Sequence, residues 1–210
     1  MLGWLKKRPG DSEGRKALLA EAEERLVTLI PLRVKSLGIR EPVYCLRIWY
    51  YGTDTVGDRV PSLMLPKEAV RRKLMSEQGA KAPHYLWCAD ELMDASWSYN
   101  AEIDDAAVSD LCRRWCDYPW GSRPEAEELS PIREMVQRIA ARLNKLSWRE
   151  YAPVTDDFVA FAADASHTFC NDYEEMSASV SVERIEALRS QRMLGTEPWW
   201  TLDAVAEEDD

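Results

Sequence analysis

Apolar residues recur every three or four positions over several long stretches of the chain, which is the spacing of one buried face of an α-helix. The first stretch begins at Asp11 and carries an apolar stripe from Leu18 to Ile30, with charged residues between. Pro31 predicts an end or a kink in this helix, and Gly38 predicts a stop for any further turn. Comparable patterns predict further helices over 66–78, 104–116, 130–145, 168–177 and 181–192.

Shorter stretches follow the pattern of β-strands. β-Branched and aromatic residues dominate 43–52, a second short strand is expected over 60–66, and the polar segment between them predicts an antiparallel hairpin. Over 97–103 apolar and polar residues alternate with a period of two, which is typical of a strand. The run "FVAFAA" at 158–163 has no polar alternation and predicts a strand covered on both faces.

This mixture of elements favours an α+β fold, with a mainly antiparallel sheet and helices packed against it. A chain of 210 residues can bury a sizeable core without metals or disulfides. The polar segment after the helix at 104–116 differs in composition from its surroundings, but it is too short to mark a domain boundary. We therefore expect residues 1–10 to form a loose leader, 11–196 a single α+β domain and 197–210 an acidic tail.

The charge balance narrows the class of partner. The chain has 37 acidic and 27 basic side chains and a formal charge of −10. Such a chain repels phosphate backbones, which disfavours nucleic acid as the main ligand, and attracts basic proteins. The simpler interpretation is that acidity serves solubility alone.

The sequence predicts a cytoplasmic protein that makes no membrane contact. Its apolar runs are far shorter than the ~20 residues that cross a bilayer. The opening "MLGWLKKRPG" has its lysines after a very short apolar start, which is not the order of a signal peptide. The five cysteines are odd in number, which excludes a complete disulfide framework within one chain and fits a reducing compartment.

Four residues raise the possibility of a zinc site. His84 and Cys88 are four positions apart, as are Cys112 and Cys116, so each pair would share a helix face and could ligate one tetrahedral ion. The segment "CRRWC" continues an apolar stripe, however, and cysteine is among the most buried residue types. Core packing is therefore favoured, and no metal or other cofactor is expected.

Three aspartates surround the apolar run at 158–163. Asp156 and Asp157 precede it and Asp164 follows it, so a strand between them would separate its ends by about 20 Å. One metal ion cannot reach both ends. We expect these residues to form turns and aid solubility, with a contribution of Asp164 to a surface pocket or partner contact as the alternative.

No catalytic signature stands out in the chain. It contains no G-x-S-x-G, no glycine-rich phosphate loop and no H-E-x-x-H, and it has only two histidines. Carboxylate pairs are frequent, but an acidic chain supplies them by chance. The sequence therefore favours a non-catalytic role. An enzyme with an unrecognised carboxylate or cysteine site remains the alternative, with Glu102, Asp164 and Cys170 as its residues.

Several segments spread over residues 12–195 resemble one bacterial family. They are "VYCLRIWYYGTD", "YLWCADELMDASWSYNAEIDDAAVSDLCRRW", "VTDDFVAFAADA" and "SVERIEALRSQRML". They include a W-x-Y-x-x-E element (Trp97, Tyr99, Glu102) and a T-D-D-F-V element (155–159). The chain thereby resembles a bacterial domain-of-unknown-function family associated with toxin–immunity loci. This resemblance carries over no catalytic residue and implies a binding role, in which an acidic surface bearing aromatic residues occludes a basic toxin.

Three hypotheses of different classes follow. The first is a non-catalytic cytosolic protein-binding module, such as an immunity protein, whose contact surface is an edge formed by Trp97, Tyr99, Glu102 and Asp164. The second is the enzyme with a carboxylate or cysteine site. The third is a zinc-stabilised regulatory domain built on the four metal-ligating candidates.

Overall fold

The computed structural model describes residues 11–50, 60–87, 92, 94–116, 130–164 and 172–194. Helices and strands alternate along these ranges, and short 3₁₀ turns occur at 79–81 and 148–150. The elements are α1 (Asp11–Ser36), β1 (Val43–Tyr50), β2 (Ser62–Pro66), α2 (Glu68–Gln78), α3 (Ala82–Trp87), β3 (Ser98–Glu102), α5 (Ala106–Cys116), α6 (Ser130–Leu143), β4 (Val154–Asp164), α7 (Asp172–Ser177) and α8 (Val182–Ser190).

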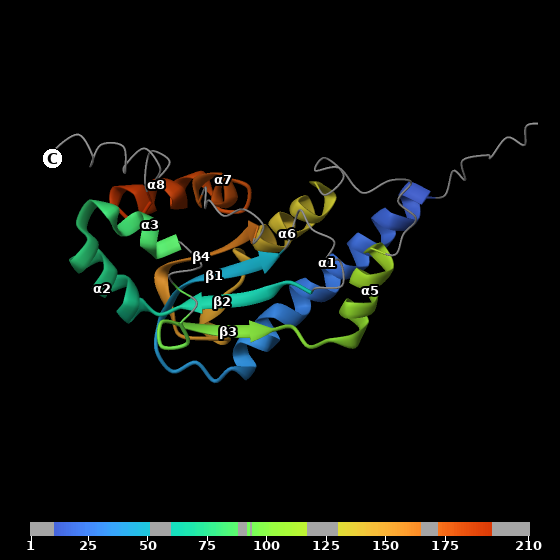
Figure 1. Cartoon of the computed structure of the whole chain (residues 1–210), viewed down its shortest axis with the longest axis horizontal. Coiled ribbons are helices and arrows are strands. Elements are labelled where there is room, and N and C mark those ends of the chain that lie inside the picture. Colours follow the sequence, from blue (N-terminus) through green and yellow to red (C-terminus); the bar gives the residue numbers. More distant parts are fainter. Residues whose placement is uncertain are drawn as a thin grey trace, which may run out of the picture.

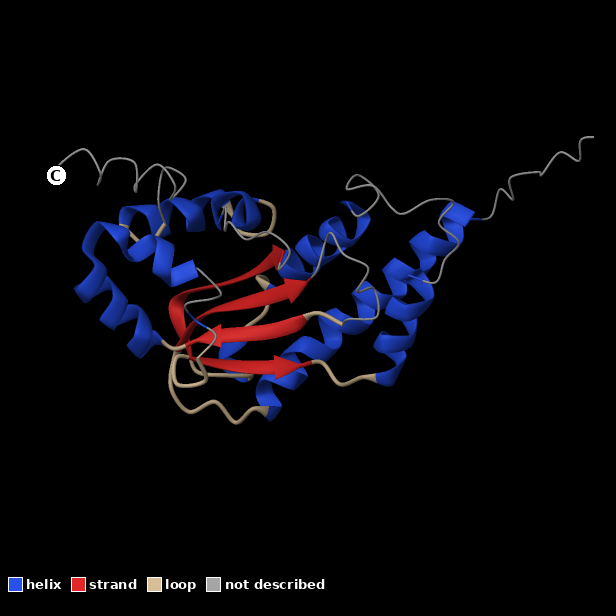
Figure 2. Ribbon diagram, viewed as in Figure 1, coloured by secondary structure: helices blue, strands red, loops and turns tan. Residues whose placement is uncertain are grey.

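The four strands form one sheet in the order β3-β2-β1-β4 (Figures 1 and 2). β1 pairs antiparallel with β2, and β2 pairs antiparallel with β3. The predicted α+β class and the mainly antiparallel sheet are therefore confirmed. One pairing differs, because β4 lies parallel to β1, which makes the sheet mixed. The chain between these two strands runs through β2, β3 and several helices, which is the long connection that a parallel pair requires.

Helices cover both faces of the sheet (Figure 1). Alternate strand residues such as Leu46, Ile48 and Leu63 join a first core with α1, α5 and α6. Their neighbours, such as Cys45 and Phe161, join a second core with α2, α3, α7 and α8. We call these sides of the sheet the first face and the second face. β1 is covered on both, which explains why its sequence is apolar at almost every position.

The first helix continues beyond Pro31 and ends before Gly38, where the sequence predicts a stop for any further turn. α1 continues through Pro31 to Ser36, and Gly38 then adopts a positive φ of 60° beyond the helix end. Proline removes one backbone donor from a helix, but α1 accommodates Pro31 at a buried position. Near its end, Arg33 Nε donates a hydrogen bond of 2.9 Å to the carbonyl oxygen of Glu102, which ties α1 to the end of β3.

The outer edge of β4 is covered by polar side chains from neighbouring segments. Asn144, just after α6, acts like a partner strand: its Nδ2 donates to the Ala160 carbonyl at 2.8 Å and its Oδ1 accepts from the Ala160 N–H at 2.7 Å. The same Nδ2 donates to the Ser179 carbonyl at 2.8 Å. Glu175 Oε1 accepts from the Asp164 N–H at 3.0 Å. These contacts satisfy backbone groups that an open edge would offer to another chain.

β4 also begins earlier than predicted, so Asp156 and Asp157 lie within the strand. Val43 faces Val154, but Cys45 faces Val159, so β4 bulges outward over 155–158. The expectation that these two aspartates form a turn before the strand is therefore wrong. A bulge re-aims side chains, and here it leaves Asp156 exposed while Asp157 is largely buried.

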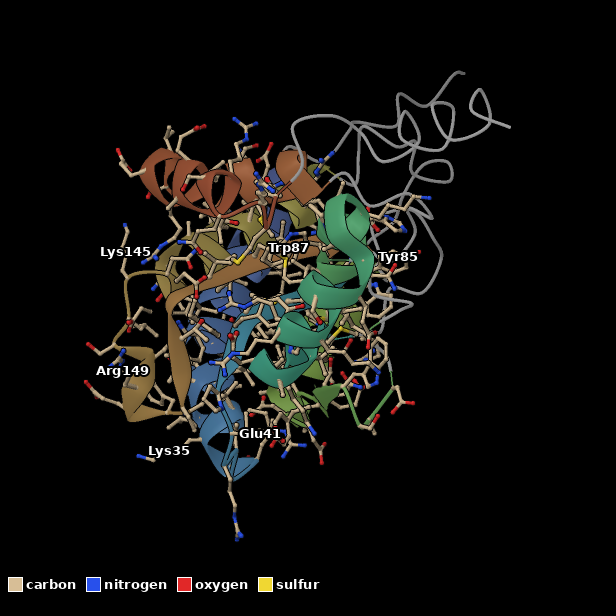
Figure 3. All side chains as sticks on the ribbon, turned by 90° about the vertical axis from the view of Figure 1, so that its left-hand side faces the viewer. Lys35, Glu41, Tyr85, Trp87, Lys145 and Arg149 are labelled. Atoms are coloured by element: carbon tan, nitrogen blue, oxygen red, sulfur yellow. The ribbon has the colours of Figure 1, made fainter. Side chains whose placement is uncertain are left out.

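Several tryptophans and one cysteine fill the interior of the protein. Trp87, Trp115, Trp148 and Cys45 are all at most 5% exposed. The Trp87 indole N–H donates to the Met193 carbonyl, and Figure 3 places this residue inside the molecule while Lys35, Lys145 and Arg149 point outward. Cys88 and Cys170 lie outside the described residues. No helix among the described residues is both long enough and apolar enough to cross a membrane.

We expect Asn144→Ala to lower the free energy of unfolding by about 2–3 kcal/mol, because it leaves both polar groups of Ala160 without their partner. Gln137→Ala, at a half-buried position on α6, is the matched control and should cost under about 0.5 kcal/mol. Urea denaturation measures both variants. Equal losses in the two would show that the Asn144 contacts do not hold the β4 edge.

Candidate functional site

A pocket of about 240 Å³ opens on the second face of the sheet, over the ends of three strands. The strand register explains which residues line the pocket. Glu102 of β3 lies opposite Ser62 of β2, and Ser62 lies opposite Trp49 of β1. Residues in register point to the same face. We call this cavity the β3 pocket, and its lining residues are Trp49, Ser62, Leu63, Met64, Asn100, Ala101 and Glu102.

The walls of the β3 pocket combine apolar surface with a few polar groups. Trp49 and Met64 contribute an indole ring and a thioether, while Asn100 and Ser62 contribute an amide and a hydroxyl. Glu102 is exposed and supplies a carboxylate. The indole Nε1 of Trp49 is buried and has no hydrogen-bond partner among the described residues. This lining suits a group that is apolar along its length and positively charged at one end.

A buried arginine lies next to the pocket. Arg47 is 3% exposed, and its Cζ lies 5.5 Å from the centre of the Trp49 ring and 5.7 Å from that of Phe161. Its Nη1 donates to the backbone carbonyl of Trp87. Aromatic rings attract cations through their negative faces, so these contacts stabilise Arg47 in the interior. Arg47 in turn holds the Trp49 ring in place at the pocket wall.

Tyr99 and Trp97, predicted from one alternating pattern, pack on different sides of the sheet. Tyr99 packs against the first core, whereas Trp97 precedes the strand in a turn and packs against the second core. The Trp97 ring lies 5.5 Å from Lys73 Nζ. The pattern with a period of two is thus interrupted where the turn ends and β3 begins at Ser98.

Tyr99 belongs to a small ion-paired cluster at the start of β3. Its hydroxyl donates to Glu41 Oε1 at 3.1 Å, and Lys67 Nζ lies 3.1 Å from the same oxygen and 5.0 Å from the Tyr99 ring. Hydrogen bonds from Lys67 and Tyr99 lower the pKa of Glu41. Burial, together with the Glu41 carboxylate, raises the pKa of Tyr99. Within this cluster the positive charge of Lys67 therefore balances the negative charge of Glu41.

Asp164 lies on the opposite edge of the sheet from the other three predicted residues. β1 and β2 separate β4 from β3, and three strand spacings of about 4.8 Å put roughly 14 Å between the edge strands. The prediction of one edge containing Trp97, Tyr99, Glu102 and Asp164 is therefore wrong. The cause is the parallel pairing, which places β4 beyond β1.

Asp164 forms a separate group with Tyr50 and Glu175. Asp164 and Glu175 are 8% and 9% exposed, and they face Tyr50 at the end of β1. Burial and the two carboxylates raise the pKa of Tyr50, which the charge of Arg133 partly counters. Glu102 and Asp164 could not act on one substrate atom across this distance, and Cys170 lies outside the described residues. The residues named for the enzyme alternative thus do not form one described site.

The four zinc candidates are not brought together either. His84 lies in α3, whose core residues cover the second face, and Cys112 lies in α5 on the first face, so the sheet stands between them. Burial raises the pKa of the Cys112 thiol to about 11, which disfavours the thiolate that zinc binds. Cys88 and the Cys116 side chain are outside the described part of the chain, within which no three His, Cys, Asp or Glu residues could hold a metal ion.

The sequence identified one lining residue of the β3 pocket, Glu102, and missed the rest. Trp49 was assigned to a strand, but nothing along the chain places it beside Asn100. A usable signal was present in the alternation itself, because Ser62, Met64, Asn100 and Glu102 occupy same-face positions of their strands. The alignment of the strands was the missing information.

Comparison with known proteins gave no match: no family model, curated protein sequence or solved structure is significantly similar to the chain. The resemblance to a toxin–immunity family therefore stays a prediction.

Asp157 is held by an ion pair between β4 and α2. Arg71 Nη1 lies 2.7 Å from Asp157 Oδ2, and the two side chains are 11% and 13% exposed. Arg71 Nε also contacts Glu68 Oε2 at 2.5 Å. Burial raises the pKa of Asp157, but hydrogen bonds from Arg71 and Thr155 outweigh burial and hold that pKa below its usual value.

We expect Asp157→Asn to lower the free energy of unfolding at pH 7 by about 2 kcal/mol, since it leaves part of the Arg71 charge uncompensated. A depressed pKa in the folded state stabilises the protein above the unfolded value of about 3.9. That stability is lost as pH falls through the folded pKa, so the difference between the two proteins should be smaller at pH 3 than at pH 7. Urea denaturation at both pH values measures this.

Asp156→Asn is the matched control for this experiment. The side chain of Asp156 is 90% exposed and its partner Arg149 is 71% exposed. Exposed ion pairs contribute little, so this variant should match the wild type at both pH values. A difference between wild type and Asp157→Asn that is as large at pH 3 as at pH 7 would contradict a role for the Asp157 charge.

Proposed function

We propose that the protein is a non-catalytic, cytoplasmic protein-binding module that holds a basic protein partner at the β3 end of its sheet, as an immunity protein occludes a toxin. The observation that carries this proposal is the β3 pocket, where an exposed carboxylate, Glu102, stands beside the indole of Trp49. An aromatic residue beside an acidic one is the pairing that recognises basic side chains.

The charge of the chain supports a basic partner. The formal charge of −10 attracts positively charged proteins over long distances and raises their rate of association. Exposed acids also lie on either side of β3, at Asp94 before the strand and at Asp104 after it. Asp104, two residues beyond Glu102, adds negative charge close to the pocket, whereas Asp94 lies beyond the other end of the strand.

Side-chain contacts at the two sheet edges also bear on where a partner binds. Side chains of Asn144 and Glu175 satisfy backbone groups along the β4 edge. At β3, Arg33 covers the carbonyl of Glu102, while the exposed side chain of that residue remains in the pocket wall. Glu102 therefore presents its carboxylate, and not its backbone carbonyl, to a partner at this edge.

We expect the tagged protein to recover a basic partner in stoichiometric amount from lysates of its own source cells at low salt. The complex should weaken as salt is raised, because charged contacts are screened. Glu102→Lys should weaken the complex at least tenfold by calorimetry. The control Glu134→Lys reverses a 65%-exposed charge on α6 and should change the affinity less than threefold. Recovery of no stoichiometric protein would overturn the proposal.

A cell-based experiment tests the occlusion itself. If a toxin gene adjoins the gene for this protein, co-expression should restore growth to cells that express the toxin. Glu102→Lys should lose this protection while Glu134→Lys retains it. Protection that persists in Glu102→Lys would place the toxin contact elsewhere on the surface.

A further inference from the structure

We infer that the β3 pocket binds one arginine side chain of the partner, a specificity that rests on the proposed function. The pocket measures about 240 Å³. Sites for drug-sized ligands and cofactors span about 300–1,000 Å³, so this pocket suits a single long side chain better than a nucleotide or prosthetic group. Its one described charge is the carboxylate of Glu102, which attracts a cation and repels an anion.

The chemistry of the lining favours a guanidinium. Its plane can lie against the indole of Trp49, and its forked N–H groups can meet both oxygens of the Glu102 carboxylate. Met64 offers an apolar surface for the methylene stem. A lysine ammonium is a compact point charge that neither stacks nor forms the paired bonds, so it should bind more weakly.

The molecule already contains the same kind of contact within its core. The guanidinium carbon of Arg47 lies 5.5 Å from the centre of the Trp49 ring. The positive charge of Arg47 opposes the entry of a second cation nearby. Glu102 supplies the carboxylate in the described pocket lining, so binding of a cation should depend strongly on that residue.

The indole of Trp49 borders the pocket through its ring, while its N–H is buried inside the protein. Buried polar atoms nearly always have hydrogen-bond partners. Trp49 Nε1 has none among the described residues. This atom is closed off from solvent, so a ligand in the pocket would meet the ring of Trp49 and not its N–H.

Three small probes test this inference on the full chain: N-acetyl-arginine amide, N-acetyl-lysine amide and N-acetyl-citrulline amide. Citrulline has nearly the shape of arginine but carries no charge. We expect the arginine probe to shift the Trp49 indole N–H resonance saturably, with lysine at least threefold weaker and citrulline at least tenfold weaker. Comparison with a Trp49→Phe spectrum assigns that resonance among the nine tryptophans.

Charge-neutral variants locate the binding site. Glu102→Gln should weaken the arginine probe at least tenfold, which corresponds to about 1.4 kcal/mol. Glu134→Gln removes the same charge from α6 and should leave the affinity within twofold. Glu102 is exposed, so both variants should keep the wild-type melting temperature.

Equal affinities for arginine and citrulline, or an unchanged affinity in Glu102→Gln, would overturn the arginine pocket. These results are separable from those for the proposed function. A partner that binds the wild type while the arginine probe does not would refute the pocket alone. Conversely, specific arginine binding without any stoichiometric partner would support the pocket and refute the binding-module proposal.

Discussion

The parallel pairing of β1 with β4 is the contact on which the rest of this structure depends. It makes β1 an inner strand, between β2 and β4, with apolar residues on both of its faces. The helices divide into two layers, one on each face of the sheet, and cover these residues. The same pairing also makes β4 an edge strand despite its apolar sequence. The Asn144 and Glu175 contacts then become necessary, because an apolar edge with open backbone groups invites aggregation.

The second layer of helices covers the sheet unevenly, and the β3 pocket results from this. α2 contacts β1 and α7 contacts β4, while the pocket lies over the β3 side of the same face. The ion pair between Arg71 and Asp157 also holds α2 on the β4 side of the sheet. Over the described part of β2 and β3, the β3 pocket leaves room for a side chain from another protein.

The sequence predicted most elements because their signals are local. Ser130 and the apolar stripe after it place the start of α6 correctly, and Ser181 caps α8 through its contact with the Arg184 N–H. Errors arose where long-range packing outweighed local preference. The bulge in β4, for example, drew Asp156 and Asp157 into a strand that the sequence predicts to begin after them.

Hydrophobic periodicity and charge by themselves determined the α+β class, the buried state of β4 and the acidic character of the chain. Only the tertiary structure decided which residues became neighbours. Glu102 and Asp164 fell on opposite edges, while Trp49 and Glu102, far apart along the chain, came to line one pocket. The physical reason is that strand order and register depend on contacts between distant segments, whose energies no local pattern of residues encodes.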